Sequence, residues 1–162
     1  MGVEQTASLM ALAQAQHGAV AIAQLGDIDV TRRWLDNLVR RGMLQRAAPG
    51  VYTVAGATST WHQRLSVGLL ALGEASWASH DAAATLHGFD RARDDAVEFT
   101  VERTARGRRM PFTVHTTATV PQIDRVTVDD FRCISATRTV VDLARARIPR
   151  VRLEAAIDSA VR

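Results

Sequence analysis

The chain has 162 residues with a single cysteine, and a chain of this length buries enough surface to fold without disulfides. All 20 basic residues are arginine, which excludes sites that need a lysine, such as a P-loop, a Schiff base or a kinase site. The net charge of +3 and the arginine usage are compatible with nucleic-acid binding, and no stretch approaches the roughly 18 apolar residues of a membrane span, so we expect a cytoplasmic protein.

Two helices are predicted in the first 30 residues. Apolar residues at helical spacing predict a first helix from Thr6 to Gln16, which His17 and Gly18 end. The apolar residues between Val20 and Leu25 predict a second, short helix that stops at Gly26.

Residues 30–54 predict a capped helix followed by a hairpin. Thr31 carries the hydroxyl of an N-cap, so we expect the helix to begin near Arg32 and to end at Gly42. Two short strands joined by a Pro-Gly turn are expected to follow, at Met43–Arg46 and Val51–Val54. Three helices and then a hairpin are the order of a winged helix-turn-helix, which we expect to be a DNA-binding domain over residues 1–56.

The outer face of the third helix carries the residues that we expect to read DNA. Its apolar residues must face a core, and at about 100° per residue the opposite side presents Arg33, Asn37 and Arg40. Arginine and asparagine pair bidentately with guanine and adenine edges in the major groove. The residues around them that we expect to contact the DNA backbone are Thr31, Arg32, Arg41 and Arg46. The alternative is a solvated face on which Asp36 pairs with Arg40.

A second α+β domain is predicted over residues 57–162. Thr60 and Gln63 have the spacing of a capping box at the start of a helix that reaches Gly73. Three further helices are expected, one capped by Ser79 or Asp81, one capped by Ser135, and one over Val151–Arg162. Two strands with period-two alternation, Val97–Glu102 and Phe112–Thr116, are expected to pair as a hairpin, and two more strands to turn at Asp129 and Asp130.

The loop of the predicted hairpin is basic. Arg106, Arg108 and Arg109 form a candidate second contact to DNA phosphates, the alternative being a solvated hairpin tip. Strand alternation places Glu98 and Glu102 on the solvated side of their strand, which accounts for them without a metal.

No constellation in the second domain predicts catalysis. His80 and His87 are expected roughly 10 Å apart along one helix, too far to share a metal. Arg138 and Asp142, four residues apart, are expected to form a structural ion pair. We therefore expect no catalytic residue, no cofactor and no metal in this chain.

The segments resemble a known family. The run RRGMLQRAAPGVYTV at residues 40–54 resembles the winged-helix domain of the abortive-infection AbiEi-type antitoxins of type IV toxin-antitoxin systems. Three later runs resemble the middle region of related actinobacterial proteins, so the resemblance spans nearly the whole chain: SHDAAATLHGF at 79–89, VEFTV at 97–101 and SATRTVVDLA at 135–144.

The resemblance implies a sequence-specific repressor that binds inverted repeats in the promoter of its own toxin-antitoxin operon. It also implies a second domain associated with antitoxicity, and a nucleotidyltransferase toxin that is opposed without a tight complex. Many relatives continue into a very-short-patch-repair-like endonuclease domain. Two alternatives therefore stay open: the DNA-recognition portion of a larger nuclease, cut before its catalytic domain, and a winged-helix module that docks a protein.

Overall fold

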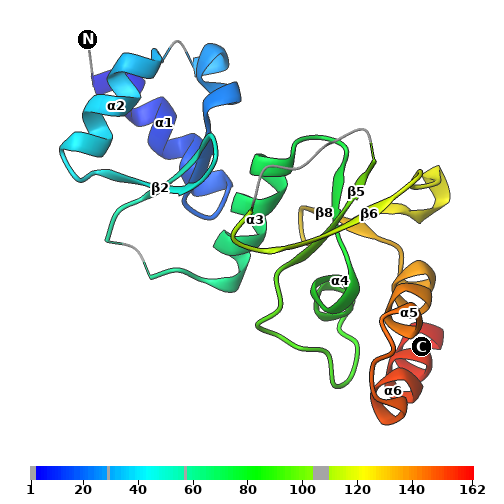
Figure 1. Cartoon of the computed structure of the whole chain (residues 1–162). Helices are drawn as coiled ribbons and strands as arrows, with labels where there is room; N and C mark the ends of the chain where they lie inside the picture. The colour runs from blue at the N-terminus through cyan, green and yellow to red at the C-terminus, as the bar shows by residue number, and fades with distance from the viewer. Residues whose placement is uncertain (1–2, 29, 57, 104–109) are drawn as a thin grey trace. The chain divides into compact units, whose positions relative to one another are not determined.

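The computed structural model describes residues 3–28, 30–56, 58–103 and 110–162 and divides the chain into two compact units, which can be followed in Figure 1. The first unit extends to residue 71, and the second begins at residue 72. Within the described ranges the chain forms six α-helices and two β-sheets, which confirms the predicted α+β class. No helix in those ranges is long and apolar enough to span a lipid bilayer.

The first unit packs helices on both faces of a small antiparallel sheet. Its helices are α1 (Val3–Ala15), the 3-10 helix η1 (Ile22–Ile28), α2 (Arg32–Arg40) and α3 (Trp61–Leu72, counted with this unit to residue 71). Its strands are β1 (Ala19–Ala21), β2 (Leu44–Ala48) and β3 (Val51–Val54), in the order β1-β3-β2. The predicted first helix, third helix and hairpin are therefore present.

The predicted helix between Val20 and Leu25 is present only in part, as a 3-10 helix that begins at Ile22 and continues past Gly26 to Ile28. Ala19–Ala21 form a strand in which Val20 lies opposite Tyr52, and the chain then enters the 3-10 helix. A short apolar run without a full helical period fits a strand or a helix, and here the backbone of β3 supplies the partner. The amide of Ile22 also donates to the carbonyl of Gly50 at 2.8 Å, which ties η1 to the hairpin turn.

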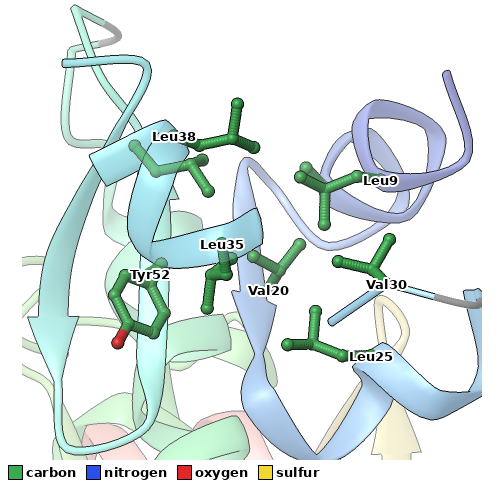
Figure 2. Packing of buried hydrophobic residues seen from close by; sticks show 9 residues of the cluster. Leu9, Val20, Leu25, Val30, Leu35, Leu38 and Tyr52 are labelled. Carbon is green, nitrogen blue, oxygen red and sulfur yellow. The ribbon is translucent and has the colours of Figure 1, made fainter. Parts of the chain in front are cut away.

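One face of the sheet is covered by α1 and α2. The apolar core between these helices and the sheet holds α2 in place. Figure 2 shows Leu35 of α2 between Tyr52 and Val20, and Leu38 and Leu9 belong to the same apolar cluster. Thr31 Oγ1 accepts from the amide of Trp34 at 3.3 Å, which confirms the predicted N-cap. These contacts determine which side of α2 faces outward.

The other face of the sheet is covered by α3. Small side chains on β1 and β2 allow α3 to approach, and Val67 packs against Ala19, Ala21, Ala48 and Val51. The sequence analysis assigned this helix to the second domain, whereas its contacts place it with the first unit.

The entry to β1 is fixed by a glycine. Gly18 has φ +86°, and a Cβ there would lie 2.7 Å from Nε2 of Gln63. That amide donates to the carbonyl of His17 at 3.1 Å. Thr60 Oγ1 does accept from the amide of Gln63 at 3.1 Å, as predicted.

The second unit has a five-stranded mixed sheet in the order β6-β5-β4-β8-β7. The strands are β4 (Ser76–Ala78), β5 (Glu98–Glu102), β6 (Thr113–Thr117), β7 (Arg125–Val128) and β8 (Phe131–Ile134). The helices are α4 (His80–Leu86), the 3-10 helix η2 (Gln122–Asp124), α5 (Ala136–Arg145) and α6 (Arg150–Val161). Leu143 and Ala156 join α4, α5 and α6 in one apolar cluster with Ala84 and Phe89.

The predicted hairpin of β5 and β6 is wrong, because the two strands pair in parallel. Glu98 lies opposite Thr113, and Thr100 lies opposite His115. Period-two alternation predicts two strands but not their direction, and the connection is long enough to return the chain to the starting end of β5. Residues 104–109, with Arg106, Arg108 and Arg109, lie outside the described residues.

Other local predictions for this unit are confirmed. β7 and β8 pair antiparallel through Asp129 and Asp130, both with positive φ. Ser135 caps α5 by accepting from the amide of Arg138 at 3.3 Å. Cys133 is fully buried, and burial raises the pKa of its thiol to about 12.

Candidate nucleic-acid interface

The structure places the predicted base-reading residues together on the outer face of α2. Arg33 and Arg40 are exposed and Asn37 is half-buried, and the helical period puts the three within one narrow sector. The axial separation of Arg33 and Arg40 is about 10 Å, at 1.5 Å per residue. That length is comparable with the width of the major groove, about 12 Å.

The helix is a rigid support for these side chains. Leu35 is fully buried and Leu38 is 6% exposed, so the opposite side of α2 is anchored in the core. The amide of Arg41 donates to the carbonyls of Asn37 and Val39, which closes the last turn. A rotation of α2 that hid Arg33 would expose these leucines, which makes it costly.

The guanidinium groups of this surface are available to a ligand. Arg32, Arg33, Arg40 and Arg41 are exposed, and within the described ranges none of them forms an ion pair. Asp36 and Arg40, both among the described residues, do not form the ion pair that was the alternative interpretation of this face.

The hairpin adds one arginine on the same side of the sheet as α2. Arg46 lies opposite Tyr52 in the ladder, and residues opposite each other point to the same face. The ring of Tyr52 packs in the core beneath α2, so Arg46 also leaves the sheet on that face. The register shifts between Arg46 and Ala48, and this bulge turns Ala48 toward α3.

A second group of polar side chains, which the sequence analysis did not assemble, lies in the second unit. His80 begins α4, Glu98 begins β5 and His115 is in the middle of β6. The rings of His80 and His115 stack with centroids 3.6 Å apart, and His115 Nε2 lies 2.9 Å from Glu98 Oε2. We call His80, Glu98 and His115 the His-Glu-His cluster.

Glu98 was predicted to lie on the solvated face of its strand, and this prediction was wrong. The face is half-buried because α4 packs on β5, and Thr100 on the same face is only 3% exposed. The sequence pattern does not specify the parallel pairing, in which His115 lies opposite Thr100 and diagonally across from Glu98. His87, which was predicted to lie too far from His80 to share a metal, hydrogen-bonds to the carbonyl of Ile134 at 2.8 Å.

Burial and charge act together on the His-Glu-His cluster. Burial, and then the neighbouring His115, lower the pKa of His80 below its ordinary value. Burial raises the pKa of Glu98, but the hydrogen bond from His115 and the adjacent histidines outweigh it, and the pKa lies below its usual range. A carboxylate and a neutral imidazole are the forms that bind cations.

A cavity of about 190 Å³ adjoins the cluster. Arg138 and Asp142 line it, and Arg138 Nε donates to Asp142 Oδ1 at 3.0 Å, which confirms the predicted pair. Arg138 also bonds to Asp124 at 3.2 Å, and these carboxylates raise its pKa. The other oxygen of Asp142, Oδ2, is buried without a hydrogen-bond partner among the described residues.

Comparison with known proteins found no family model that matches the chain and no curated protein that matches it. The resemblance to AbiEi-type antitoxins therefore stays a prediction that rests on the four sequence runs.

Proposed function

We propose that the first unit binds double-stranded DNA in a sequence-specific manner, and that the chain is an antitoxin-type repressor of its own toxin-antitoxin operon. The observation that carries the proposal is the outer face of α2, where Arg33, Asn37 and Arg40 stand together on a helix anchored by Leu35 and Leu38. These are the side chains that pair with guanine and adenine edges.

The topology of the first unit supports a winged-helix interpretation. The element order α1-β1-η1-α2-β2-β3, with an antiparallel sheet ordered β1-β3-β2, is compatible with that domain. In this interpretation α2 is the recognition helix, the 3-10 helix η1 takes the place of the second helix, and the β2–β3 hairpin is the wing.

The residues divide by role. Arg33, Asn37 and Arg40 read base edges, and a good bidentate pair discriminates against the wrong base by about 1–3 kcal/mol. The phosphate contacts, which set register and affinity, come from Arg32, Arg41 and Arg46, with the hydroxyl of Thr31 beside them. Arg106, Arg108 and Arg109 remain a candidate second phosphate contact.

The proposed DNA target is an inverted repeat in the promoter. Such a repeat places two half-sites in opposite orientation and is occupied by two protomers. The proposed functional partner is a nucleotidyltransferase toxin that the second unit counters without a tight complex.

The test is fluorescence-anisotropy binding of the chain to a duplex from its own upstream region and to a scrambled duplex of equal composition, over a salt series. We expect preference for the upstream duplex to persist as salt rises. Three phosphate contacts per protomer predict a slope of log K against log salt of about −3 per bound protomer.

Equal, weak binding to both duplexes that disappears with salt would contradict the repressor proposal. Specific binding to the upstream duplex together with a reading frame that continues into a nuclease domain would favour the DNA-recognition portion of an enzyme. No binding to either duplex would favour a protein-docking module.

A further inference from the structure

Three side chains of kinds that can bind metals converge in the second unit, whereas α2 and the β2–β3 hairpin belong to the first. Each residue of the His-Glu-His cluster offers one ligand atom, and these atoms all lie within 4.8 Å of one another. The three residues come from α4, β5 and β6, elements separated in sequence and joined by the sheet. Each is half-buried, so an ion would be partly shielded from solvent and still reachable.

The kinds of atom in the cluster select a class of ion. Two imidazole nitrogens and one carboxylate oxygen form a ligand set used by Zn²⁺ in open sites, where three protein ligands leave one coordination position for water. Mg²⁺ and Ca²⁺ prefer oxygen ligands throughout and are disfavoured by imidazole.

We propose that His80, Glu98 and His115 bind one divalent transition-metal ion of the Zn²⁺ class, with a fourth coordination position open to the adjoining cavity. The proposal is independent of DNA binding by α2 and the β2–β3 hairpin, because it concerns residues of the other unit and a different ligand.

A buried carboxylate in the wall of the cavity is a second feature that points to a ligand. Asp142 is 5% exposed and lines the cavity together with His80 and His115. Its Oδ1 accepts from Arg138, while its Oδ2 is buried and lacks a hydrogen-bond partner among the described residues. A buried carboxylate oxygen normally has a partner. A water on the open position of the ion would supply a donor for it.

The backbone and neighbours of His80 hold its ring for such a role. His80 Nδ1 lies 3.0 Å from Oγ of the fully buried Ser79, and a proton on Nδ1 would donate to that hydroxyl. In the tautomer with the proton on Nδ1, Nε2 is the nitrogen with a free lone pair, the arrangement typical of metal-binding histidines. His80 also has φ +52°, a left-handed conformation that L-residues rarely adopt and that collects at functional sites.

Binding would rearrange contacts already present in the cluster. The hydrogen bond between His115 Nε2 and Glu98 Oε2, 2.9 Å long, would be replaced by bonds from the ligands to the ion. The two rings stack with an angle of 20° between their planes. They would tilt until their in-plane lone pairs converge on the ion. The two imidazole rings and the carboxylate, which are the proposed ligands, are thus already close together before an ion binds.

The experiment is calorimetric titration of Zn²⁺ into the full chain after treatment with a chelator, with Co²⁺ absorption as a spectroscopic check of imidazole coordination. We expect one equivalent of Zn²⁺ to bind. His115→Ala and Glu98→Gln are each expected to weaken binding at least tenfold, because each removes one of three protein ligands.

His80→Gly separates loss of the ligand from loss of the fold. Glycine adopts φ +52° without strain, so this variant should fold at least as well as the parent chain while losing the ion. Circular dichroism establishes that each variant is folded before titration.

The matched control is His62→Ala in the first unit. His62 is exposed and stacks on His17 with centroids 5.3 Å apart, so this pair is the alternative source of surface zinc binding. We expect the control to bind Zn²⁺ as the parent does. The absence of saturable binding, unchanged binding in folded variants of the cluster, or loss of binding only in His62→Ala would each overturn the proposal.

Discussion

Arginine is the basic residue used throughout the proposed DNA surface, and its position decides what it can contact. On the outer face of α2, Arg33 and Arg40 flank Asn37, so a planar guanidinium can approach a guanine edge while the amide approaches an adenine. Arg46 is on the hairpin instead, on the same side of the sheet as α2 but outside the helix. We therefore propose that it contacts the DNA backbone rather than base edges.

This difference gives a prediction for Arg46→Gln. The change removes one phosphate contact, so binding to the upstream and scrambled duplexes should weaken by the same factor, and the slope of log K against log salt should decrease in magnitude by about 1 per protomer. Anisotropy titrations at four or more salt concentrations measure both quantities. A loss confined to the upstream duplex would instead make Arg46 a base-reading residue.

The candidate sites differ in how far sequence could predict them. Each of Arg33, Asn37 and Arg40 is about one helical turn from the next. A local pattern was therefore enough to place all three on one face of α2. His115 is separated from Glu98 by a connection whose direction no local pattern specifies. The structure places His115 opposite Thr100, with its Nε2 2.9 Å from Glu98 Oε2.

At the scale of elements, the predicted caps of α2 and α5 and the predicted turn between β7 and β8 were confirmed, whereas Ser79 stands at the start of α4 without a side-chain cap hydrogen bond. The predictions for Ala19–Ala21 and for the direction of β6 were wrong, because they depended on the pairing of strands that a local pattern does not specify. Thr31 and Ser135 cap their helices, and Asp129 and Asp130 turn the chain, because each acts on backbone groups a few residues away. The segment Ala19–Ala21 is a strand because β3 pairs with it. A distant partner of this kind has no signature in the local sequence.

The junction of α1 and β1 gives a stability prediction. Gly18→Ala should lower the free energy of unfolding by about 1–2 kcal/mol, because φ +86° is strained for alanine and its Cβ would displace the Gln63 amide that bonds to His17. Chemical denaturation monitored by circular dichroism measures the change.

The control for this prediction is Gly26→Ala in η1. A Cβ at Gly26 meets nothing within 4 Å, and its φ lies outside the left-handed range. This variant should be neutral or slightly stabilising. Equal destabilisation by both changes would contradict the structural role given to Gly18.

At the scale of the whole molecule, two compact units carry two different proposals. The first unit presents the outer face of α2, and the second contains the His-Glu-His cluster beside its cavity. The modest net charge of +3 means that generic attraction to DNA is limited. Specific contacts of α2 must therefore account for much of any tight binding.

The measurement that tests this most directly compares the parent chain with the double variant Arg33→Ala/Asn37→Ala on the upstream and scrambled duplexes. A matched control is Arg150→Gln, which removes one positive charge from a side chain that is 91% exposed in the second unit. We expect the double variant to lose at least about 1–3 kcal/mol on the upstream duplex, with little change on the scrambled one, and the control to bind as the parent does. Equal losses on both duplexes would contradict base reading by α2.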